Sequence, residues 1–140
     1  MHEETGVKAL EHGVDQLEAV RRHGVTVALD DFGAAATNFA QLRELPIDTL
    51  KIDRSFVARV GDRAKASDVE LLRAMVGIGH GLGLTVVAEG IETAAQRARV
   101  EGMAVQEGQG FLFSHAVPAE MVGAAVATST PVRPPRPLRR

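Results

Sequence analysis

The sequence contains no cysteine, tryptophan or tyrosine. The lack of cysteine excludes disulfide bonds and thiolate metal sites, and a reducing cytoplasm is the expected location. Long apolar runs are also missing: no stretch reaches the roughly 18 residues of a membrane-spanning helix. The first residues, MHEETGVKAL, do not join a basic region to an apolar one. We therefore expect neither membrane insertion nor a signal peptide.

A strong excess of charge of one sign is missing too. The 16 basic and 18 acidic residues give a net charge of -2. This balance gives no reason to expect a nucleic-acid partner. The last ten residues, PVRPPRPLRR, differ from the rest because proline and arginine dominate them. We expect residues 128–140 to be a disordered, solvated tail rather than an anchor, and residues 1–127 to form one modest domain.

Hydrophobic periodicity predicts helices that alternate with strands. Apolar residues at steps of three or four predict helices over 7–23 and 37–45. Short apolar or β-branched runs predict strands over 25–29, 49–53 and 84–89, with a fourth centred on 104–107 or slightly later. This order indicates a parallel α/β sheet, which is either a small open sheet or half of a (β/α)8 barrel.

Three further helices follow from capping and turn signals. Ser67 and Glu70 have capping-box spacing at the start of a long helix that ends at Gly81 or Gly83. Thr93 and Gln96 have the same spacing before a helix that ends near residue 101. Pro118 is expected to open the last helix.

Polar side chains stand where each predicted strand ends: Asp30 and Asp31, Lys51 and Asp53, Glu89, and Gln109. The carboxyl ends of parallel strands meet at one rim, where active sites of such folds form. Neighbouring carboxylates suit Mg²⁺ or Mn²⁺, which prefer oxygen ligands and activate water toward phosphoryl groups. The pattern therefore predicts a metal-assisted phosphate-ester hydrolase.

At the same residues the sequence resembles the EAL family of cyclic-di-GMP phosphodiesterases. Four stretches carry the resemblance, in the family's order and spacing: DDFG at 30–33, LPIDTLKIDRSFV at 45–57, VVAEGIET at 86–93 and QGFLFSHAVP at 109–118. The resemblance implies the second half of a TIM-like (β/α)8 barrel, with about four parallel strands and flanking helices. It also implies hydrolysis of cyclic-di-GMP to pGpG at a site with two divalent cations.

The resemblance assigns roles residue by residue. It implies metal ligands at Asp30, Asp31 and Asp53, and catalytic groups at Lys51, Glu89 and Gln109. Glu4 and Glu92 resemble acidic residues that support neighbouring loops; for Glu92 the alternative is a first-turn acid favoured by the helix dipole. Phe111 and His115 are candidate substrate contacts, although the alternation of Phe111 and Phe113 after Gln109 favours the core for both phenylalanines.

Two departures from the family pattern leave an alternative open. The tripeptide EAL is absent from the 140 residues, and Ala34 to Asn38 replace the family's Thr-Gly-Tyr-Ser-Ser. A complete barrel needs roughly 250 residues. The alternative is an inactive cyclic-di-GMP-binding or protein-interaction module. Because half of a barrel would have two open edges and uncovered inner side chains, we expect a homodimer or association with the missing half of the domain.

Overall fold

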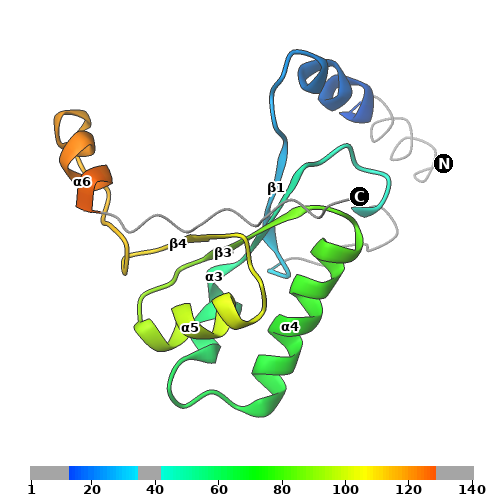
Figure 1. Ribbon diagram of the computed structural model, residues 1–140. Helices are drawn as coiled ribbons and strands as arrows, with labels where there is room; N and C mark the ends of the chain where they lie inside the picture. Colours follow the sequence, from blue (N-terminus) through cyan, green and yellow to red (C-terminus); the bar gives the residue numbers. More distant parts are fainter. Residues whose placement is uncertain (1–12, 35–41, 129–140) are drawn as a thin grey trace, which may run out of the picture.

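The computed structural model describes residues 13–34 and 42–128. Figure 1 shows a sheet with its helices, after a first helix over residues 13–22. In chain order the elements are β1 (Ala28–Phe32), β2 (Thr49–Ile52), α3 (Arg54–Val57), η1 (Ala58–Val60), α4 (Ala66–Gly81), β3 (Thr85–Glu89), α5 (Ala94–Gly102), β4 (Glu107–Gln109), η2 (Ala119–Met121) and α6 (Val122–Thr128). Glu4, most of the predicted helix over 37–45 and the tail over 129–140 lie outside the described residues.

The four strands form one parallel sheet in the order β1-β2-β3-β4. Consecutive strands are therefore neighbours, and α4 and α5 are the crossovers between β2 and β3 and between β3 and β4. This arrangement confirms the predicted α/β class with flanking helices. No helix within the described part of the chain is long and apolar enough to cross a membrane.

Two strand boundaries differ from the prediction. Val25 was expected in a buried strand, but it is 53% exposed and precedes β1. Asp48, just before β2, is hydrogen-bonded to Val27, just before β1. The Asp48 carboxylate accepts the Val27 N–H at 2.8 Å, and the Val27 carbonyl accepts the Asp48 N–H at 2.8 Å. β4 covers only residues 107–109, at the late end of the predicted range. Apolar runs thus located both strands, while hydrogen bonding set their bounds.

One of the two predicted capping boxes is present. Thr93 caps α5 by accepting the Gln96 N–H at 3.2 Å, and the Gln96 side chain accepts the Thr93 N–H at 3.0 Å. The box predicted at Ser67 and Glu70 is wrong, because α4 begins earlier, at Ala66, with Lys65 as an N-cap that makes no side-chain hydrogen bond. Ser67 therefore lies inside the helix.

The apolar side chains of the strands pack on the helical side of the sheet. Leu50, Ile52, Val86 and Ala88 are fully buried and belong to one core cluster with residues of α4 and α5. Gly79 of α4 approaches so closely that a Cβ there would lie 2.5 Å from Val86. α4 and α5 lie on the same side of the sheet in Figure 1.

The opposite face of the sheet is polar. Strand alternation and register place on it Asp30, Thr49, Lys51, Thr85, Val87, Glu89, Glu107 and Gln109. The apolar residues of this face are the small Ala28, which pairs with Thr49 and is exposed, and Val87, which is 7% exposed. The expectation that a half barrel uncovers large apolar inner side chains is therefore wrong for the described strands, because their large hydrophobic residues other than the buried Val87 point toward the helices.

Candidate functional site

A β-bulge brings two adjacent carboxylates to the same side of β1. Leu29 pairs with Leu50, but the next paired residues are Phe32 and Ile52, so Asp30 and Asp31 together oppose Lys51. In a regular strand, neighbours would point to opposite faces and one aspartate would enter the core. Asp31 completes the bulge with a positive φ of 53°, and its N–H donates to Asp30 Oδ1 at 2.9 Å.

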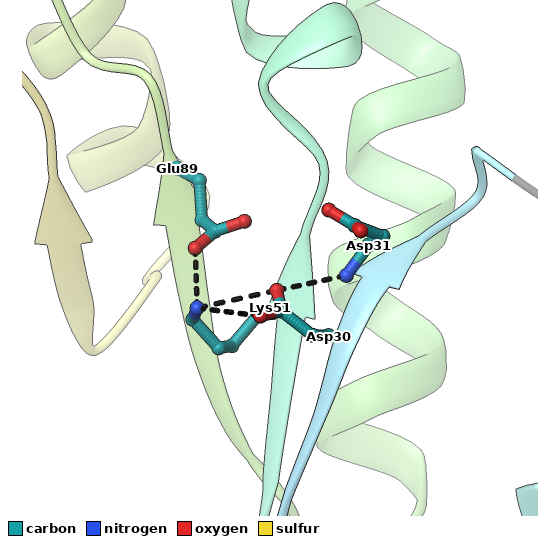
Figure 2. A network of polar contacts seen from close by, with 4 residues as sticks. All are labelled: Asp30, Asp31, Lys51 and Glu89. Atoms are coloured by element: carbon teal, nitrogen blue, oxygen red, sulfur yellow. Dashed lines mark hydrogen bonds and ion pairs between the residues drawn. The ribbon is translucent and has the colours of Figure 1, made fainter.

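Lys51 connects the carboxylates of β1 and β3. Its Nζ lies 3.2 Å from both carboxylate oxygens of Asp30 and 2.5 Å from Glu89 Oε1. Figure 2 shows the ammonium between these two side chains, with Asp31 beside them. The Lys51 and Glu89 side chains are only 22% and 15% exposed, whereas that of Asp30 is 60% exposed. The lysine thus balances negative charge at the open rim of the sheet.

The protonation of this network follows from its contacts. The hydrogen bond to Glu89 raises the pKa of Lys51 above its ordinary value, and the contact with Asp30 acts in the same direction. The hydrogen bond from Lys51 lowers the pKa of Asp30, and the backbone N–H of Asp31 adds to that effect. At neutral pH the lysine is therefore a cation that donates hydrogen bonds rather than a base.

The residues present fit a hard divalent cation. Asp30, Asp31 and Glu89 each offer a carboxylate oxygen, and these oxygens lie within 4.8 Å of one another. Oxygen-only donors suit Mg²⁺ or Mn²⁺ better than softer metals. Asp53 and Gln109, also predicted at the site, are not in this group of three.

An open cleft of about 510 Å³ extends from this cluster along the ends of the strands. Its lining includes Asp31, Asp53, Glu89, Glu92 and Gln109. The volume is in the usual range for small-molecule sites. With Phe111, which also lines it, the structure brings six of the predicted residues around one cavity, which the loops after β1, β2, β3 and β4 build.

Asp53 and Glu92 differ in their local roles. The Asp53 carboxylate caps α3 by accepting the Ser55 N–H at 2.9 Å, and hydrogen bonds from Ser55 lower the pKa of Asp53. Glu92 precedes the N-cap Thr93, and α5 has no acidic residue in its first turn. The interpretation of Glu92 as a first-turn acid is therefore wrong.

The two phenylalanines after β4 lie in different environments. Phe113 packs against the core beneath Arg97, whose guanidinium lies 5.7 Å from the ring centroid. Phe111 is 60% exposed and lines the cleft, so its prediction as a core residue is wrong. The exposed ring of His115 stacks on Phe111, with centroids 4.3 Å apart and planes at 14°. An aromatic pair thus borders the cavity.

Sequence reasoning missed Arg54 and two glycines at this rim. Arg54, Gly90 and Gly110 all line the cleft. A Cβ at Gly110 would lie 2.2 Å from the Ile91 carbonyl oxygen, and the Ile91 N–H donates to Gln109 at 3.0 Å. The loops after β3 and β4 are therefore in backbone contact. Gly90 has a φ of +74°, which favours glycine, but a single sequence gives no signal for the close approaches.

A profile of the EAL domain family matches residues 2–116. The chain belongs to the EAL domain family. Among curated proteins, it is 40% identical over 114 residues to the cyclic di-GMP phosphodiesterase NbdA of Pseudomonas aeruginosa. That match covers 79% of this chain and 14% of NbdA, so the chain spans well under a fifth of that relative.

Solved EAL structures share the fold. The EAL domain of Mycobacterium smegmatis DcpA superposes with a TM-score of 0.78 at 36% identity, over 87% of this chain and 54% of that one. Klebsiella pneumoniae BlrP1, solved with manganese and cyclic-di-GMP, gives a TM-score of 0.64 at 32% identity, over 72% of this chain and 25% of BlrP1. The four strands thus correspond to part of an EAL TIM barrel.

Proposed function

We propose that this EAL chain supplies part of a site that hydrolyses cyclic-di-GMP to linear pGpG with divalent cations. One observation carries the proposal: Asp30, Asp31 and Glu89 gather with Lys51 at the strand ends of an EAL sheet. NbdA and the BlrP1 complex support the choice of substrate, and BlrP1 also supports a metal requirement. In the reaction, water adds to a phosphorus atom and a P–O3′ bond breaks.

The side chains divide the work by their chemistry. Asp30, Asp31 and Glu89 would hold Mg²⁺ or Mn²⁺, which when bound polarises the phosphoryl group and lowers the pKa of water. Lys51 keeps its proton and donates hydrogen bonds to an attacking water or to phosphate oxygens. Asp53 and Gln109 line the same cleft. In this proposal Asp53 is a further metal ligand, and Gln109 forms a hydrogen bond with the attacking water.

The aromatic pair completes the substrate site. Phe111 is exposed, so a guanine base can stack on one face of its ring, while the ring of His115 stacks on the Phe111 ring and supports it. Glu92 and Glu4 support the loops of the site in this proposal. Glu4 is assigned from the family resemblance alone.

A second candidate is a cyclic-di-GMP-binding or protein-interaction module without turnover. The observation that favours it is the small number of ligands: the cluster holds three carboxylates among the described residues. Hard cations take about six oxygens, and a two-metal site needs still more. The 140 residues alone should therefore bind the metal weakly.

The test compares the 140-residue chain with a chimera. The chimera joins the chain to the segment of the DcpA EAL domain that it does not cover. With Mg²⁺ or Mn²⁺, the chain alone should bind cyclic-di-GMP but turn it over far below the 1–1000 per second typical of enzymes, on the order of a thousandfold slower. The chimera should hydrolyse it, and Glu89→Ala should abolish that activity.

The readout is pGpG by chromatography, and circular dichroism checks folding. A folded chimera that binds cyclic-di-GMP without hydrolysing it would favour the second candidate. Fast turnover by the 140 residues alone would show that three carboxylates suffice for the metal.

A further inference from the structure

The cleft lining has an imbalance of charge that an anionic ligand would meet. It contains four carboxylates, on Asp31, Asp53, Glu89 and Glu92, and one cationic side chain, Arg54. A cyclic dinucleotide carries two phosphates, each with a negative charge. Cations at the Asp30, Asp31 and Glu89 cluster can neutralise the phosphate that reacts. The other phosphate needs a positive group elsewhere in the cleft.

Arg54 is placed for this role by the chain around it. It is the first residue of α3, directly after the helix cap Asp53. Gly90 abuts its backbone: a Cβ at Gly90 would lie 2.5 Å from Arg54 Cβ and 3.3 Å from its Cα. The loop after β3 thus fixes where the Arg54 side chain starts, at the wall of the cleft.

The guanidinium is available to a ligand. Arg54 is exposed, and within residues 13–34 and 42–128 its guanidinium makes no hydrogen bond or ion pair, although its charge contributes to the lowered pKa of the neighbouring Asp53. Lys51 at the site is already paired with Asp30 and Glu89, and Arg21 is paired with Asp48, which precedes β2. Arginine can grip a phosphate with two parallel N–H donors.

We propose that Arg54 binds the phosphate of cyclic-di-GMP that is not undergoing hydrolysis, and so orients the ring of the substrate over the carboxylate cluster. The proposal rests on the proposed function, because it takes the ligand from there. Beyond the proposed function, it identifies Arg54 as a substrate-binding residue whose positive charge and two parallel N–H donors bind the phosphate.

The experiment titrates the 140-residue chain with cyclic-di-GMP, pGpG and guanosine in the presence of Mg²⁺, by calorimetry. Arg54→Gln should weaken binding of cyclic-di-GMP and pGpG about tenfold, the loss expected for one charged hydrogen-bonding group. Arg54→Lys should lose less, because it keeps the charge but not the fork. Guanosine, which has no phosphate, should bind both variants like the wild type.

Arg63→Gln is the matched control. Arg63 is exposed and is not part of the cleft lining, so this variant makes the same change of charge and should bind all three ligands normally. If wild type binds cyclic-di-GMP and Arg54→Gln binds it equally well, the role of Arg54 is refuted while the proposed function stands. If the wild-type chain binds no cyclic-di-GMP, the binding expected under the proposed function fails, and this inference fails with it.

Discussion

Asp31 combines a strained backbone with a carboxylate of the site. Its φ of 53° is in the left-handed region, which glycine adopts without cost. We expect Asp31→Gly to raise the free energy of unfolding by about 0.5–1 kcal/mol and to weaken metal binding. Urea denaturation and calorimetry with Mn²⁺ measure the two effects.

Ala104 offers the matched control. It has a φ of 60°, lies just after α5, is exposed, and is remote in sequence from the carboxylate cluster. Ala104→Gly should give a similar rise in stability and leave metal affinity unchanged. A loss of stability in Asp31→Gly together with a gain in Ala104→Gly would mean that the Asp31 side chain stabilises the bulge.

Lys51 links the stability of the chain to pH. The hydrogen bond from Lys51 lowers the pKa of Asp30 in the folded state. The stability that this interaction contributes is therefore present above the ordinary carboxyl pKa of 3.8, and it is lost as pH falls through the lower pKa of the folded state. The pKa of Lys51 is raised, so its contribution is present below 10.5 and is lost as pH rises through its higher value.

The variant Lys51→Met should therefore differ most from wild type at neutral pH. The difference in free energy of unfolding should shrink on acidification below about pH 4 and again above about pH 10.5. Chemical denaturation across this range measures it. A difference that is constant from acid to alkali would show that the ion pairs add nothing and that only packing changed.

At the scale of elements, α4 contains two glycines with opposite surroundings. Gly79 is buried against β2 and β3, and a Cβ there would lie 2.5 Å from Val86 and 3.3 Å from Leu50. Gly77 has nothing within 4 Å of its added Cβ. We expect Gly77→Ala to stabilise the chain by up to about 1 kcal/mol through helix propensity, and Gly79→Ala to destabilise it by about 1–3 kcal/mol through overpacking.

Thermal or urea unfolding of the two variants tests this directly, because both make the same substitution in the same helix. Equal stabilisation of both would mean that α4 can move away from the sheet by a few tenths of an ångström without loss.

The elements show how far sequence reasoning reaches. Apolar runs located β2 and β3, and the Thr93 box located α5, because these signals are local. The bulge in β1 was not predictable, since it depends on pairing with β2. The same holds for α3 and η1, which are too short for a periodic pattern. The carboxylates at the strand ends were identified by position, whereas the role of Arg54 depends on the approach of Gly90.

At the scale of the whole molecule, the described sheet has two edge strands. β1 and β4 each pair with one neighbour, so their other edges offer backbone groups to a partner. We therefore still expect self-association at micromolar concentration, now driven by the edges rather than by an apolar inner face. Analytical ultracentrifugation over a dilution series measures it.

A compact monomer with a cooperative melt above about 60 °C, high for a mesophile domain, would contradict this expectation. Such a result would mean that the short length of β4 already protects that edge and that the four units close a core unaided.

The bulge makes the chemistry of the site depend on the length of the chain. Loss of one codon between Leu29 and Phe32 would restore strict alternation in β1 and leave a single aspartate facing the cluster. The hydrophobic residues on the helical side would keep their places, so the product would still fold. Under the proposed function, a single in-frame deletion is thus a short route from an active member of this family to a descendant that has the fold and lacks the reaction.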